Sequence, residues 1–250
     1  SDVVWRPTPV QLIEWLSQPA PFTEADIETS GIEPLRASIR TVSLTIPDLD
    51  AAGQPVDPAA EPHLVAQNAR TIATSLLSAD GVSRFYTGED ERLIRNIFRW
   101  AFDPDTMDET AWAWIRHVWE TFIQWAGPTW EEVQRIWATH RIWTGFNFGY
   151  FDKQFIERPW ERLFAARGWN PMIPKGLKTQ GTIWTMVPGR WDLDDEGKKV
   201  AMGQKGDDPL LTYNIVDTEV GARTHVGMVG AAAKCGLFDP LPEYLKPEQW

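Results

Sequence analysis

The chain has 250 residues and a mass of 28.5 kDa, with 24 basic and 35 acidic side chains and therefore a formal charge of −11. This acidity argues against a protein that holds the phosphate backbone of nucleic acid, because such a surface is usually basic. A hydrophobic content of 43% excludes a disordered chain. No apolar run approaches the roughly 18–20 residues of a membrane span, so we expect no membrane insertion.

The N-terminal segment carries the signals of two helices. Thr8, Pro9 and Gln11 form a capping box with proline at the first helical position, which predicts a helix that ends before Pro19. A second helix is predicted over 23–31. An apolar pair brackets its start in the spacing of a hydrophobic staple, and a glycine closes it.

One strand and two further helices are predicted between 42 and 101. Apolar and polar residues alternate over 42–46, which is typical of a strand. The proline-rich stretch 47–62 is longer than a usual loop and indicates a functional loop or an arm bound by a partner. Apolar stripes at helical spacing then predict helices over 62–79 and 89–101.

The middle of the chain predicts a tryptophan-rich helical hairpin. Two capping boxes, at 106–109 and 129–132, mark the starts of two helices, and a Gly-Pro pair separates them. We expect these helices over about 108–126 and 130–144, packed against each other across a tight connection.

From residue 181 onward the pattern changes to short β-forming runs between glycine and aspartate clusters. Strands are predicted over 182–187, 198–202, 210–216 and 223–229. Because helices precede strands rather than alternate with them, the sequence predicts an α+β fold. Its parts are a helical region over 1–168, then a small, mainly antiparallel β region over 169–250 that ends in an irregular tail. The two regions are expected to be two domains or the two layers of a single domain.

The 15 tryptophans are the most unusual feature of the composition. Large apolar side chains on several faces of one helix indicate that it is buried on several faces, within a large core or against another subunit. We therefore expect contacts with other protein subunits through Trp112, Trp114, Trp130 and Trp250. The alternatives are that the indoles only fill the core, or that they form a platform for a sugar or a cation.

The search for catalytic groups leaves one candidate constellation. His117 and Glu120 are three residues apart on a predicted helix and share a side of it. If the hairpin packs closely, His140 would join them in an acid–base site. A histidine on the apolar stripe of a helix is more often a hydrogen-bonded core residue, so we lean against an enzyme.

Metal and cofactor motifs are absent from the sequence. Asp192, Asp194 and Glu196 resemble the start of a calcium loop, but position twelve is Gly203 instead of glutamate, so a solvated acidic turn is expected. No nucleotide-binding or zinc motif is present, and we expect no cofactor. His225 is expected to be a surface histidine on a strand.

The favoured function is a non-catalytic subunit of a larger assembly, such as a virion component or an accessory subunit of an enzyme complex. The alternatives are an enzyme with a tryptophan-lined pocket and a carbohydrate- or cation-binding module. Binding to nucleic acid is not expected. A single cysteine, Cys235, and a chain that starts at Ser1 without a leader favour the cytoplasm or a particle assembled there. Secretion after cleavage of a signal stays open.

Overall fold

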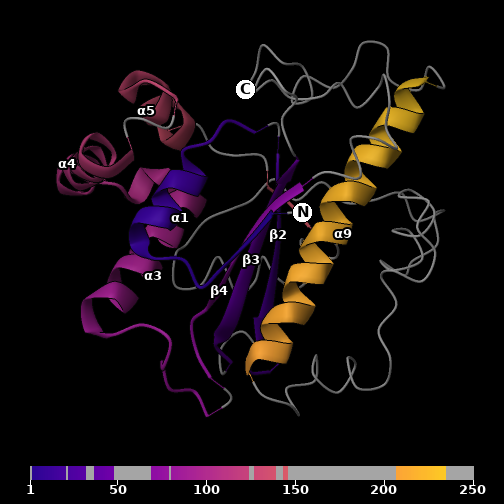
Figure 1. Ribbon diagram of the computed structural model, residues 1–250, viewed down its shortest axis with the longest axis horizontal. Helices are drawn as coiled ribbons and strands as arrows, with labels where there is room; N and C mark the ends of the chain where they lie inside the picture. The colour runs from indigo at the N-terminus through magenta and orange to yellow at the C-terminus, as the bar shows by residue number, and fades with distance from the viewer. Residues whose placement is uncertain are drawn as a thin grey trace.

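The computed structural model describes residues 2–20, 22–31, 37–47, 69–78, 80–123, 127–138, 143–145 and 207–234. These residues form a five-stranded mixed sheet with helices on both of its faces (Figure 1). The strands are β1 (Asp2–Trp5), β2 (Thr23–Thr29), β3 (Ile39–Pro47), β4 (Ala69–Ser75) and β5 (Trp143–Thr144). The α-helices are α1 (Pro9–Leu16), α3 (Gly88–Phe102), α4 (Glu109–Val118), α5 (Trp130–Ala138) and α9 (Asp207–Lys234). A short 3-10 turn η1 (Pro104–Thr106) precedes α4, and a π-helical turn η2 (Trp119–Ile123) follows it.

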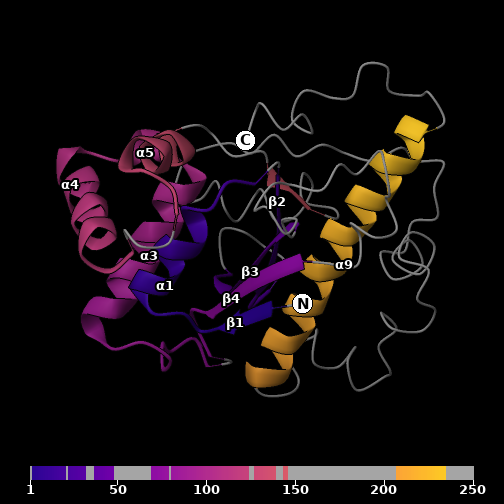
Figure 2. The ribbon, with the colours of Figure 1, turned by 45° about the horizontal axis from the view of Figure 1, so that its top comes forward.

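The sheet has the order β1-β4-β3-β2-β5. Strands β2, β3 and β4 are consecutive and antiparallel, while β1 runs parallel to β4 and β5 runs parallel to β2. Figure 2 shows β1 beside β4, with α9 passing across the strands. It follows that β1, β4, β2 and β5 all point the same way, so their carboxyl ends meet at one end of the sheet.

One face of the sheet is apolar and carries the main core. Side chains alternate between the two faces of a strand, so β2 contributes Ala25 and Ile27 to this face and β3 contributes Val42, Leu44 and Ile46. Helices α1, α3, α4 and α5 cover this face, with α4 and α5 outside α1 and α3 (Figures 1 and 2). The core therefore lies between the sheet and the helices from the first 138 residues.

The opposite face of the sheet is covered by the long helix α9 alone among the described elements (Figure 1). The apolar contact here is small: Leu211 and Ile215 pack on Ala73 of β4, with Val3 beside them. The remaining sheet positions under α9 carry polar side chains. This face positions the candidate site.

Local signals explain the helices that the sequence predicted. The Thr8 hydroxyl accepts from the backbone N–H of Gln11, whose side chain accepts from the N–H of Thr8, so α1 has the expected capping box. The same reciprocal pair forms between Thr129 and Glu132 at the start of α5. At α4 the cap is Asp108 rather than Thr106, because the Asp108 carboxylate accepts from the N–H of Ala111.

The predicted order of helices before strands is wrong. The described structure places all five strands before residue 145 and places a helix over 207–234, where the prediction had strands at 210–216 and 223–229. Helices and strands are both present, which is consistent with an α+β composition, but the region 1–168 contributes the sheet and 169–250 contributes a helix that covers it. The predicted strands 182–187 and 198–202, and most of the arm 47–62, lie outside the described residues.

Three predicted elements change type for tertiary reasons. The predicted helix 23–31 is strand β2, and the described part of the predicted helix 62–79 is strand β4. The end of the predicted helix 130–144 is strand β5, since α5 ends at Ala138. In each case the local sequence is compatible with both a helix and a strand, and pairing within the sheet favours the strand. None of the described helices combines the length and apolarity needed to cross a membrane.

Candidate active site at the carboxyl end of β2

A polar layer lies between the sheet and α9. Strand β2 directs Glu24, Asp26 and Glu28 to this side, because Ala25 and Ile27 between them enter the core. From α9, Asn214 and Thr218 face the same space. Burying this many polar groups is costly unless they are paired, so the layer is held together by specific contacts.

The contacts in the layer fix α9 on the strands. The Nδ2 atom of Asn214 donates to Oδ2 of Asp26 at 2.6 Å, which holds one carboxylate in place. The hydroxyl groups of Thr218 and Ser43 are hydrogen-bonded to each other. Further along, the Thr71 hydroxyl donates to Oε1 of Glu219 at 3.5 Å. Each contact joins α9 to a different strand, so the helix has a defined register on the sheet.

The layer is closed around Glu24. This glutamate is 4% exposed, and its carboxylate accepts a hydrogen bond from the hydroxyl of Thr144 on β5. Its side chain packs directly against Gly221 of α9, where a Cβ atom would lie 2.7 Å from Cδ of Glu24. Such a separation is shorter than any normal contact, so glycine is what permits the close approach of helix and strand here.

The layer opens at the carboxyl end of β2. Asp26 and Glu28 are half-buried there, as are Tyr213 and Asp217 on α9. Residues 213 and 217 are four apart in a helix and share one side of it. We call Asp26, Glu28 and Asp217 the carboxylate cluster. It joins two packed elements, and all three of its residues are half-buried.

The phenol of Tyr213 reports the electrostatics of this end. Burial raises the pKa of Tyr213 to about 12, and the negative charges of Glu28 and Asp26 add to this effect. Desolvation and nearby negative charge both disfavour the tyrosinate. Tyr213 is therefore a neutral hydrogen-bond donor at any physiological pH, next to two carboxylates.

Two buried polar atoms next to the cluster have no hydrogen-bond partner among the described residues. One is Oγ1 of Thr41, which is 1% exposed and stands directly opposite Glu28 on the same face of the sheet. The other is Oδ1 of Asn214, whose Nδ2 atom binds Asp26. Water or a ligand could satisfy these two atoms, and unsatisfied buried atoms also occur in the core far from this end of the sheet, so they do not identify a site by themselves.

The carboxylate cluster is not closed around an ion in this arrangement. Within the described ranges, no three histidine, cysteine or acidic side chains are gathered closely enough to hold a metal. The three residues belong to β2 and α9, two elements that pack against each other.

The same end of the sheet carries a positive charge at Arg6, directly after β1. Its guanidinium pairs with Asp208 near the start of α9. The Nε atom donates to the Ser75 hydroxyl at 3.3 Å, and the guanidinium carbon lies 4.2 Å from the ring centre of Phe85. Polar groups from β4 and α9 thus meet Arg6 beyond the carboxyl end of β1.

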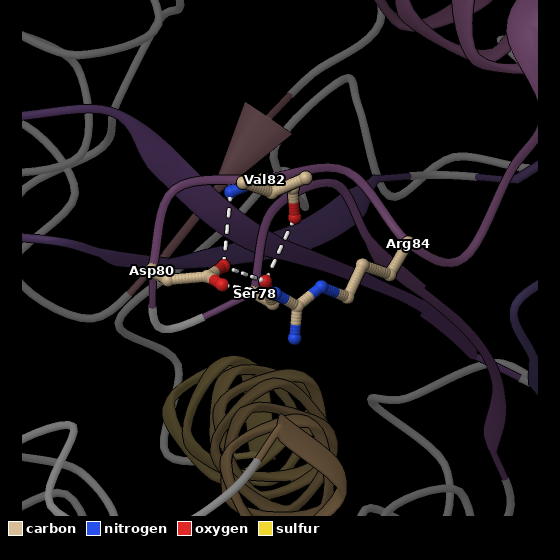
Figure 3. A network of polar contacts seen from close by, with 4 residues as sticks. All are labelled: Ser78, Asp80, Val82 and Arg84. Carbon is tan, nitrogen blue, oxygen red and sulfur yellow. Dashed lines mark hydrogen bonds and ion pairs between the residues drawn. The ribbon is translucent and has the colours of Figure 1, made fainter.

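A compact turn follows β4 at this end (Figure 3). The Ser78 hydroxyl donates to the carbonyl oxygen of Val82 at 2.8 Å, and it also bonds the carboxylate of Asp80. Hydrogen bonds from Ser78 and from the N–H of Val82 lower the pKa of Asp80, and Arg84 adds to this as an ion-pair partner. These contacts are local to the turn, so it shapes the loop and does not enter the site.

The structure does not gather the sequence-predicted acid–base residues. His117 is exposed on α4. Glu120 is exposed as well and accepts from Nε of Arg116 at 2.7 Å. His140 lies outside the described residues. The two described members are thus on an open helix surface, and one of them is engaged by an arginine.

The described tryptophans are mostly covered by the chain itself. Of the nine in the described ranges, only Trp5 is exposed, at 46%. Trp112, Trp114 and Trp130 are half-buried and pack against the core, and Trp112 meets Trp130 edge to face with ring centres 6.4 Å apart. Trp250 lies outside the described residues. The described indoles therefore fill the interior and its rim.

The remaining predicted positions either lie outside the described residues or differ from the prediction. The acidic turn Asp192, Asp194 and Glu196 and the thiol of Cys235 lie outside the described residues. The prediction for His225 is wrong: this residue is 5% exposed and belongs to α9, and its ring centre lies 4.5 Å from that of Phe22.

The carboxylate cluster escaped the sequence-based search. The spacing Asp26-x-Glu28 places two carboxylates on one face only if the segment is a strand, and it was interpreted as a helix. Tyr213 and Asp217 share a side only if their segment is a helix, and it was interpreted as a strand. Both spacings are present in the sequence. They were not recognised as a site, because the first segment was interpreted as a helix and the second as a strand.

Comparison of the chain with models of known protein families and with curated protein sequences found no match. The function is therefore argued from the geometry of the polar layer and its open end.

Proposed function

We propose that this protein hydrolyses phosphodiester bonds with a divalent cation bound by Asp26, Glu28 and Asp217. The observation that carries the proposal is the placement of Asp26 and Glu28, half-buried, on one face of an inner strand and close to Tyr213 of α9. Asp217 lies one helical turn further along the same side of α9. Rigid elements hold catalytic groups more precisely than loops do.

A hard divalent cation suits the chemistry of these groups, although the described side chains do not surround an ion in this arrangement. Carboxylate oxygens are the ligands that Mg²⁺ and Mn²⁺ prefer. Burial is the main cause of the raised pKa of Tyr213, and Glu28 and Asp26 add to it, so both carboxylates lie near the phenol and a cation there would offset their charge. The unsatisfied Thr41 hydroxyl and Asn214 carbonyl oxygen lie beside the carboxylates and offer further oxygen ligands, directly or through water.

A phosphate ester is the substrate class that suits such a cation. Mg²⁺ is commonly held by one or two carboxylates and completes its coordination with water and substrate phosphate oxygens. A phosphodiester carries one negative charge, whereas a phosphate monoester carries about 1.5 to 2 at neutral pH. In a chain with a formal charge of −11, the diester is repelled less.

Each described side chain has a defined role in this proposal. When bound, the cation supplies Lewis-acid polarisation of the phosphate and an activated water. Asn214 orients the carboxylate of Asp26 through its 2.6 Å hydrogen bond. Tyr213 keeps its proton and donates a hydrogen bond to a phosphate oxygen or to the attacking water. Glu24 is buried and engaged by Thr144, so it supports the register of β2 instead of binding substrate.

This proposal replaces the expectation that nucleic acid is excluded by charge. That expectation rests on the net charge of the whole chain, whereas a bound cation inverts the local electrostatics of a site. The assembly-subunit function stays a prediction. Its main premise was a surplus of uncovered indole, and the described tryptophans lend it little support because eight of the nine are buried or half-buried.

The test measures the rate of hydrolysis of bis(p-nitrophenyl) phosphate and of a short end-labelled oligonucleotide, in millimolar Mn²⁺ or in EDTA. We expect activity that needs the metal and falls by roughly 100-fold or more in D26N and in E28Q, the scale of losing charge stabilisation in the transition state. The matched control is E120Q, which removes an exposed carboxylate on α4.

E120Q should retain wild-type activity. Metal-dependent hydrolysis that survives equally in D26N, E28Q and E120Q would show that it arises elsewhere, and a wild type without hydrolysis of either substrate would contradict the proposal. Circular dichroism of each variant shows whether the fold is retained.

A further inference from the structure

Arg6 directly follows β1, and its side chain lies on the face of the sheet that a regular strand would not give it. Val4 packs against the apolar core, whereas Val3 packs beside the apolar residues of α9. Residues two apart on a strand share a face, so a continued strand would direct Arg6 to the core together with Val4. Its guanidinium instead pairs with Asp208, in the first turn of α9.

A left-handed backbone explains this change of direction. The φ angle of Arg6 is 47°, and among the described residues other than glycine no other φ is positive. The N–H of Arg6 donates to the carbonyl oxygen of Ala73 at 2.7 Å, which holds this backbone against β4. Strained backbone persists where the surroundings over-determine it. Here the strain has a structural result, because it turns a positive charge towards α9.

Two groups on the sheet side anchor the arginine. Its Nε atom donates to the hydroxyl of Ser75, the last residue of β4, at 3.3 Å. Its guanidinium carbon lies 4.2 Å from the ring centre of Phe85, in the loop between β4 and α3, where a cation and an aromatic face attract each other. The guanidinium therefore has contacts that do not involve α9, and Asp208 adds the contact that does.

The ion pair is the exposed part of this arrangement. The side chain of Arg6 is 27% exposed and that of Asp208 is 71% exposed. An ion pair open to solvent is weak and is screened by salt. Apolar anchorage of α9 begins at Leu210, which is 1% exposed. The residues before Leu210 are thus held on the sheet by a contact that ionic strength weakens.

We propose that Arg6 and Asp208 form an ionic latch, which holds the first turn of α9 on the sheet at low ionic strength and releases it at high ionic strength. The inference goes beyond the proposed function, because the latch needs neither a cation nor a substrate. In an α-helix the N–H groups of residues 211–213 donate to the carbonyl oxygens of 207–209. Release of the first turn therefore frees these three N–H groups to exchange with solvent.

The test is hydrogen exchange at residues 211–213, measured by two-dimensional NMR in about 0.05 M and about 0.5 M NaCl. In the wild type, exchange at these amides should be roughly two- to five-fold faster at the higher salt concentration, the scale of an exposed ion pair. In D208N the carboxylate is lost, so exchange should already be fast at low salt and should not change with salt.

A double-mutant cycle separates the latch from the effect of Asp208 on its own helix, since an acidic residue also stabilises a helix N-terminus. R6Q should accelerate the same amides as D208N does. In the R6Q background D208N should add little, because the ion pair is already lost. R84Q is the matched control: Arg84 is an exposed arginine that pairs with Asp80 within the turn after β4, so R84Q should exchange as the wild type does.

Three results would overturn the latch. The first is wild-type exchange at 211–213 that does not depend on salt. The second is an effect of D208N that is equally large in the wild-type and R6Q backgrounds, which would assign it to the helix N-terminus. The third is faster exchange throughout β1 and β4 in R6Q with no change in D208N, as expected if Arg6 only supports the strands. If R6Q fails to fold, the salt dependence of the wild type and its loss in D208N decide the question.

Discussion

The pKa of Tyr213 depends on the burial of its phenol and on the charges around it. Burial raises its pKa to about 12, with Glu28 and Asp26 contributing, against 10 for an unperturbed phenol. A raised pKa in the folded state means that the folded protein keeps a proton that the unfolded chain loses. The associated stability is fully present below pH 10 and is lost as the pH rises towards 12.

This linkage predicts the behaviour of Y213F. Between pH 8 and pH 11 the wild type should lose about 1 kcal/mol more unfolding free energy than Y213F, after allowance for the partial exposure of the phenol. Urea unfolding of both proteins at the two pH values measures the difference. Equal losses in the two proteins would mean that Tyr213 titrates normally and that the site is less buried than described.

Patterns that involve only neighbouring residues could be recognised in the sequence. The capping boxes at Thr8 and Thr129 were predicted and are confirmed, because a cap depends on residues within one turn. Asp26 and Glu28 were not identified, because their relation depends on the conformation of the segment between them. A side chain can be read as a ligand only when the face it occupies is known.

At the scale of elements, the packing of α9 on β2 depends on Gly221. A methyl group at this position would overlap the buried side chain of Glu24. We expect G221A to lower the free energy of unfolding by about 1–3 kcal/mol, as overpacking does in other cores. Urea denaturation measures this change.

A second variant identifies the cause of that loss. In the double variant G221A/E24A the clash is removed, so the penalty of G221A measured in the E24A background should be smaller than in the wild type. If the penalty is the same in both backgrounds, α9 does not pack on Glu24 as described.

The same interface explains why α9 and β2 were mispredicted. Helix α9 buries the polar side chains Asn214, Thr218 and Glu219 among apolar ones, so its buried stripe is mixed and hydrophobic periodicity does not reveal it. Strand β2 presents carboxylates to that stripe, and they resemble the exposed face of a helix. Helices α1 and α3 bury apolar stripes on an ordinary core and were predicted. The failures at α9 and β2 therefore fall on the layer that buries many polar groups, which is also where the candidate site lies.

At the scale of the whole molecule, two different interfaces hold one sheet. An apolar core on one face joins α1, α3, α4 and α5 to the strands and accounts for most of the described tryptophans. A polar layer on the other face fixes α9 by hydrogen bonds. The first face carries the apolar core, and the second carries the candidate site.

The carboxylate cluster joins segments that are far apart in the chain. Asp26 and Glu28 come from the second strand, and Asp217 comes from a helix about 190 residues later. Short motifs cannot capture such a site, because it exists only once α9 lies on β2. The net charge of −11 is an average over the whole chain and does not describe the charge at one site.

The most direct test of the account is the binding of Mn²⁺ measured by isothermal titration calorimetry. We predict that the wild type and E120Q bind at least one Mn²⁺, and that the double variant D26N/E28Q loses this binding while it keeps the helical circular dichroism of the wild type. Binding that persists unchanged in D26N/E28Q, or a wild type that binds no Mn²⁺, would contradict the claim that the open end of the polar layer is a cation site.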